Sequence, residues 1–146
     1  MQTSSSYNQY KDTMTKLLTV VKKLRLLEEN LSNAASADNA DELNRLVKDA
    51  QPLLLEFRGQ DRVREKAEVS LGIKGHSFRE VLSSFTPGQQ KELSPVFEEL
   101  TRELKLYENA KDSADRIMQV RLKDVTDRIS GMPLPERPIA FHDQLV

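Results

Sequence analysis

Apolar residues recur across residues 7–31 at alternating steps of three and four positions. This spacing places them on one face of an α-helix of about seven turns. Glu28 stands at the one place in the stripe where an apolar residue is expected. Further apolar positions widen the stripe, so we expect this helix to touch more than one neighbour. They are Leu18, Val20 and Leu27.

A second helix is predicted to begin in the polar run after residue 37 and to end at Gly72. Asp38, Asn39 and Asp41 carry side-chain oxygens that accept hydrogen bonds from free backbone N–H groups at a helix start. Pro52 lies inside this helix. Because the apolar phase continues across the proline, we predict a kink rather than a break.

A short helix and a long helix follow in the second half of the chain. Ser77 and Glu80 have the spacing of a capping box, which predicts a short helix over residues 78–82. Thr86 and Pro87 suit the cap and the first position of the last helix, whose periodic pattern runs to about residue 130. At 1.5 Å per residue that helix is on the order of 65 Å long, so it must pack lengthwise on the other helices.

The predicted fold class is all-α, as an elongated antiparallel bundle or coiled coil of three long helices plus a short connecting helix. Composition agrees, since 5% of residues are aromatic and 31% are charged, which disfavours a sheet-rich core. Residues 1–130 are predicted to form a single helical-bundle domain. Residues 131–146 mix turn formers with apolar side chains and are predicted to form a flexible C-terminal tail.

Charge and hydropathy argue against several classes of partner. The chain has 22 Lys and Arg against 23 Asp and Glu, evenly mixed, so we expect no nucleic-acid binding. No apolar run approaches the roughly 18 residues that span a bilayer, and the N-terminal segment lacks the pattern of a secretory signal. We therefore expect a cytoplasmic protein without membrane insertion.

Candidate catalytic chemistry is sparse. The pairs Glu28-Glu29 and Glu98-Glu99 have no histidine or nucleophile near them in the sequence. The chain has no cysteine and two histidines, and it carries no glycine-rich phosphate motif and no GxSxG. We predict no enzymatic activity, no catalytic residue, no cofactor and no metal site.

The second half of the last helix is the candidate binding surface. After Lys111 its apolar stripe gains width at Ile117 and Val120. We expect an antiparallel neighbour to place residues 58–70 opposite, and that segment is poor in large apolar side chains. An apolar strip with so little cover is a place where another chain docks.

The order of these parts resembles the FlgN family of flagellar export chaperones over roughly residues 10–130. The resemblance rests on ELNRLVKDAQPLLL at the start of the second helix, on the charged stretch that closes at Leu71-Gly72, on FREVL at 78–82, and on Arg121-Leu122 near the end. It implies a cytoplasmic chaperone that binds the C-terminal helices of hook–filament junction proteins. Such a chaperone prevents premature assembly and delivers these hook-associated proteins to the flagellar type III export apparatus.

The family places cargo binding toward the C-terminal end of the chain. We hypothesise that the tail around Ile139 and Phe141 covers this surface when cargo is absent. The alternative is a structural coiled-coil adaptor that uses the same strip for self-association. Both functions are compatible with a homo-oligomer. The residues that the resemblance implies for partner binding are Ile117, Met118, Leu122, Val125 and Ile129.

Overall fold

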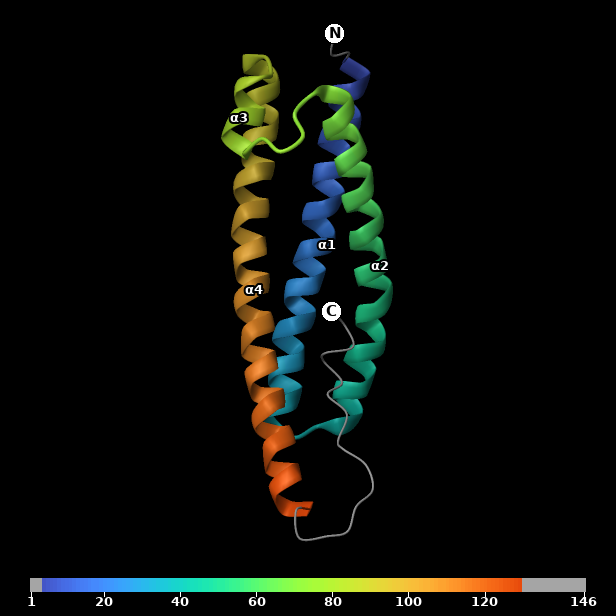
Figure 1. Ribbon diagram of the computed structural model, residues 1–146, viewed down its shortest axis with the longest axis vertical. Helices are drawn as coiled ribbons and strands as arrows, with labels where there is room; N and C mark the ends of the chain where they lie inside the picture. The colour runs from blue at the N-terminus through green and yellow to red at the C-terminus, as the bar shows by residue number, and fades with distance from the viewer. Residues whose placement is uncertain (1–3, 130–146) are drawn as a thin grey trace.

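The computed structural model describes residues 4–129 of the chain (Figure 1). This part contains four helices and no strand, which confirms the all-α class. The predicted tail, residues 131–146, lies outside the described residues. The helices are α1 (Ser4–Ser36), α2 (Ala40–Leu71), α3 (Phe78–Ser83) and α4 (Pro87–Ile129).

Helix α1 lies between the other two long helices. It packs along its length against both α2 and α4, whereas α2 and α4 have little direct packing between them. Figure 1 shows α2 and α4 on either side of α1, with α2 antiparallel to it and α4 parallel to it. The wide apolar stripe predicted for α1 is explained by these two neighbours.

Capping groups fix where the helices begin and end. The Asn39 side chain accepts a hydrogen bond from the Glu42 N–H at the start of α2, and Gly72 ends that helix with a φ of 73°. The predicted capping box of Ser77 and Glu80 is present at α3. Helix α2 continues through Pro52.

Two apolar clusters hold the helices together. The upper cluster is aromatic, and in it Phe78 of α3 stacks on Phe97 of α4 with ring centroids 4.3 Å apart. The lower cluster joins Leu31 of α1, Leu46 of α2 and Ala114 of α4. Each large side chain buried in this way contributes about 1.5–3 kcal/mol relative to exposure.

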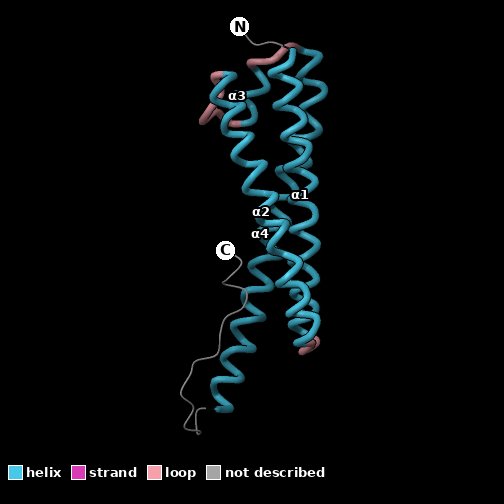
Figure 2. The backbone as a smooth tube through the Cα atoms, turned by 90° about the vertical axis from the view of Figure 1, so that its right-hand side faces the viewer, coloured by secondary structure: helices cyan, strands magenta, loops and turns pink. Residues whose placement is uncertain are grey.

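Helix α4 extends well beyond the α1–α2 turn. Arg25 of α1 and Glu103 of α4 are at the same level because their side chains form an ion pair. From these residues α1 continues for 11 residues to Ser36, and α4 continues for 26 to Ile129. The difference of 15 residues corresponds to about 22 Å of helix. Figure 2 shows this projecting end of α4 running past the turn.

Candidate partner-binding surfaces

The five residues implied for partner binding all lie in the last part of α4. Met118 is buried, with 8% of its surface exposed, while Ile117 and Leu122 are half-buried. The side chains of Val125 and Ile129 lie outside the described residues. One member of the predicted strip is therefore already covered within the chain, and two are partly accessible.

The projecting end of α4 also exposes Val120, which the sequence placed in the widened apolar stripe but not among the five partner-binding residues. Val120 is 67% exposed. Together with Ile117, Arg116 and Ser36 it lines a shallow hollow of about 320 Å³ beside the end of α1. This hollow offers a small apolar contact surface flanked by one cation.

A larger apolar surface lies higher up, between α2 and α4. Two adjoining hollows of about 260 and 230 Å³ share a floor formed by α1 and side walls formed by the other two long helices. We call this feature the central groove. Val21 belongs to its floor, Leu54 and Phe57 to the α2 wall, and Leu104 and Tyr107 to the α4 wall.

The central groove corrects the expected register of α2 against α4. Residues 58–70 were expected opposite the second half of α4, but Asp61 and Arg64 line the groove with Leu100 and Leu104 of its first half. The second half of α4 instead lies level with Leu46 at the start of α2. The poorly covered stretch of α4 therefore begins higher than the sequence indicated. Sequence reasoning missed the groove because its wall residues follow the same periodicity as core residues.

Two cations stand at the mouth of the central groove and one carboxylate on its floor. Arg58 of α2 is exposed, and no carboxylate of residues 4–129 pairs with it. Lys111 of α4 is one-quarter exposed and lies 3.4 Å from an oxygen of Asp115. Glu28 is 4% exposed and lines the floor. A group that enters the mouth meets positive charge first.

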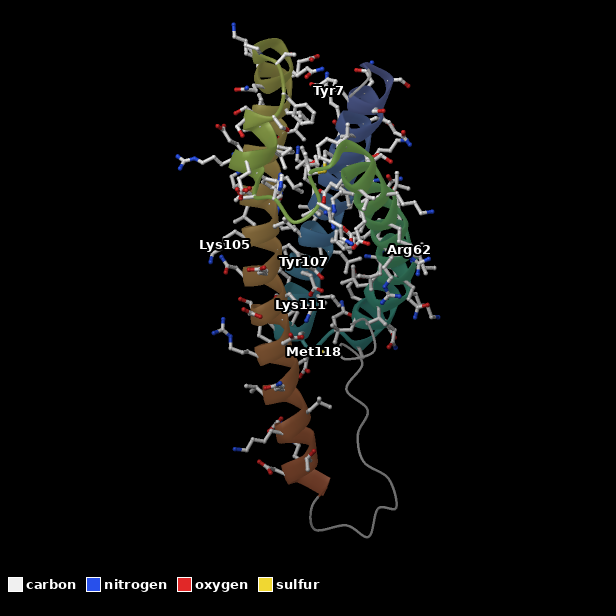
Figure 3. All side chains as sticks on the ribbon, turned by 45° about the horizontal axis from the view of Figure 1, so that its top comes forward. Tyr7, Arg62, Lys105, Tyr107, Lys111 and Met118 are labelled. Atoms are coloured by element: carbon white, nitrogen blue, oxygen red, sulfur yellow. The ribbon has the colours of Figure 1, made fainter. Side chains whose placement is uncertain are left out.

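The pKa of Tyr107 reflects the burial and the negative charge around it in the groove. Burial raises the pKa of its hydroxyl, and the negative charges of Glu28 and Asp115 raise it further. Figure 3 shows Tyr107 and Lys111 on the side of α4 that faces the space between the long helices, while Lys105 projects from the outer side. The hydroxyl therefore stays neutral and can donate or accept a hydrogen bond.

Charged residues elsewhere on α1 and α4 are used to join the two helices. Lys22 pairs with Glu99, and Arg25 pairs with both Glu103 and Glu29. Lys22 and Arg25 are thus engaged by carboxylates of α4 and of α1 itself.

A partly buried charged network on α2 lies at the upper end of the groove, close to Tyr10 of α1. Arg64 donates to Asp61 at 2.8 Å and to Glu68 at 2.9 Å, and Glu68 is 8% exposed. The hydroxyl of Tyr10 is buried and makes no hydrogen bond of standard geometry among the described residues, although the Glu68 carboxylate lies near it. Burial, and then the charge of Glu68, raise the pKa of Tyr10.

Within residues 4–129, histidines and acidic residues form no group of three that could hold a metal ion. None of the described helices combines the length and apolarity needed to cross a bilayer. Comparisons of the chain with protein-family models, with curated proteins and with solved structures find no match.

Proposed function

We propose that this chain is a cytoplasmic export chaperone for hook–filament junction proteins. In this role it binds their C-terminal helices, prevents premature assembly and delivers them to the flagellar type III export apparatus. One observation carries the proposal: α4 continues about 22 Å beyond its neighbours with apolar side chains that are not fully covered. An amphipathic client helix laid on this end hides its own apolar face without any covalent chemistry.

The described side chains of the projecting end set a limit on affinity. Covering Ile117, Val120 and Leu122 supplies about 1–2 kcal/mol each, before the cost of ordering the client is subtracted. A micromolar dissociation constant requires about 8 kcal/mol. A client helix held at that strength must therefore touch more of the protein than these three residues.

The test is binding of a synthetic peptide with the C-terminal sequence of a junction protein. At a peptide concentration of 100 times Kd, the chaperone gains about 2.7 kcal/mol of stability, which raises Tm by roughly 5–10 °C. Leu122→Asp places a charge in the contact and should abolish most of this gain. Gln119→Asp is the matched control, because Gln119 is exposed on the same stretch of helix. No rise in Tm with the unmodified protein would refute the proposed function.

A structural adaptor that self-associates is the second candidate. It is favoured by the exposure of Val120 at the projecting end, where a second copy of α4 has room to pair. Sedimentation distinguishes the two functions. A constitutive oligomer that ignores the peptide supports the adaptor, and a monomer that binds the peptide supports the chaperone.

A further inference from the structure

The α4 wall of the central groove and the projecting end lie on one face of α4. Leu104 lines the groove, and Leu122 follows it after 18 residues. Since 18 residues are about five turns, the two side chains leave α4 in the same direction. Lys111 lies between them, about two turns below Leu104. A helix lying on this face passes from the projecting end into the groove without crossing over α4.

The shape of the groove suits one additional helix. Its floor is α1, and its walls are α2 and α4, which have little packing on each other. Leu54 and Phe57 on one wall are half-buried, as are Leu104 and Tyr107 on the other. A fourth long helix in this position would complete the packing of a four-helix bundle. The stretch from Leu104 to Leu122 corresponds to a client segment of about 18 residues, roughly 27 Å long.

The positive charges at the mouth of the groove favour a client helix that carries an acidic side chain. Arg58 stands on the α2 wall and Lys111 on the α4 wall, and both line the same hollow. Arg58 has no carboxylate partner among residues 4–129, and the 3.4 Å contact of Lys111 with Asp115 is partly exposed and can be exchanged. Glu28 stays on the floor with 4% exposure. An entering helix therefore gains by placing a carboxylate between the two cations.

We propose that the client helix runs from the projecting end of α4 into the central groove, and that Arg58 and Lys111 fix its register by pairing with a carboxylate beside its apolar stripe. This inference rests on the proposed function. The partner is thus an amphipathic helix of about 18 residues with an acidic side chain at the level of Lys111. A single polar contact inside an apolar interface is a known way to specify register.

Occupancy of the groove is tested with introduced thiols in the full chain. The protein has no cysteine, so one substituted cysteine reports one position. Leu54→Cys places a thiol on the groove wall, and Leu55→Cys places the control thiol next to it on the outer surface, where Leu55 is 66% exposed. The rate of reaction with a disulfide reagent is measured with and without the junction-protein peptide, which itself lacks cysteine. We expect about tenfold slower reaction at position 54 and no change at position 55.

The outcomes separate this inference from the proposed function. If the peptide raises Tm but does not protect position 54, the groove is not its site, and the inference is overturned while the chaperone function stands. If the peptide neither raises Tm nor protects position 54, both fail. Equal protection at positions 54 and 55 also overturns the inference, because it indicates coverage unrelated to the groove.

Register is tested by charge reversal. Arg58→Glu together with Lys111→Glu should weaken peptide binding about tenfold or more. The matched control is Arg62→Glu together with Lys105→Glu, since Figure 3 shows both of these side chains projecting away from the groove. It carries the same change in net charge and should alter Kd by less than about twofold. Equal weakening by the two double variants would show a general effect of net charge and would overturn the role of Arg58 and Lys111.

Discussion

Removal of the Glu103 carboxylate should measurably loosen α4 from α1. The Glu103 side chain is 5% exposed and accepts hydrogen bonds from Nε of Arg25 at 2.5 Å and from Nη2 at 3.4 Å. Truncating one member of a buried ion pair costs about 3–5 kcal/mol. Arg25 is 20% exposed and keeps its 2.8 Å contact with Glu29, so solvent and a second carboxylate offset part of that loss. We therefore expect Glu103→Ala to lower the free energy of unfolding by about 2 kcal/mol.

The assay is urea unfolding at neutral pH followed by helical circular dichroism, with Tm as a second measurement. A loss of about 2 kcal/mol corresponds to a fall in Tm of roughly 4–8 °C for a chain of this length. Glu108→Ala is the matched control, because Glu108 is an exposed glutamate on the same helix. It should change stability by less than about 0.5 kcal/mol.

A double-mutant cycle with Arg25→Met isolates the pairwise contribution. The coupling between positions 25 and 103 should be about 1–2 kcal/mol, because the two side chains are in direct contact. Equal stabilities for Glu103→Ala and Glu108→Ala, or no coupling in the cycle, would show that burial of this pair contributes nothing to the packing of α4 on α1.

Three further changes test other parts of the fold by the same urea titration. Tyr10→Phe removes a buried hydroxyl that makes no hydrogen bond of standard geometry among the described residues, and stability should rise by up to about 1 kcal/mol; a clear loss would show that the nearby Glu68 carboxylate accepts from it. Gly72→Ala should cost about 1 kcal/mol because φ is 73°, whereas Gly59→Ala, in the interior of α2 with free space around a Cβ, should gain a similar amount; the same sign for both would contradict this account. The hydrogen bond from Lys11 holds the pKa of Glu92 below its ordinary value of 4.5, so its stabilisation is present above that pH and is lost as the pH falls through the lowered pKa. Glu92→Gln should therefore flatten the loss of stability below pH 4.5, and an unchanged acid limb would refute the assignment.

Local features of the fold could be predicted from the sequence because they depend on neighbouring residues. The capping box at Ser77 and the cap by Asn39 follow from side-chain oxygens at fixed offsets, and both are present. The apolar stripe of α1 indicated more than one neighbour, and α1 packs against two long helices. The caps depend on residues within one or two turns of each other, so they form independently of how the helices pack.

The register between α2 and α4 could not be predicted, because it depends on the axial distance that the connecting segment spans between the end of α2 and the start of α4. The chain from Gly72 to Thr86 includes α3, whose Phe78 packs on Phe97 of α4. That packing places the start of α4 beside the end of α2, and residues 58–70 consequently face the first half of α4. No periodicity in either helix encodes this offset.

The same packing explains why apolar residues with identical spacing along α4 differ in their exposed fraction. Leu93 and Phe97 are 0% and 3% exposed, whereas Leu104 and Tyr107, which continue the stripe, are half-buried. Periodicity reports which face of α4 turns inward, but exposure depends on how many helices reach that face. Near the top of α4, α3 supplies the additional cover, and Phe78 lines the upper end of the central groove. Below Phe78 the described part of the chain provides no counterpart to α3, and this missing cover leaves the groove open between α2 and α4.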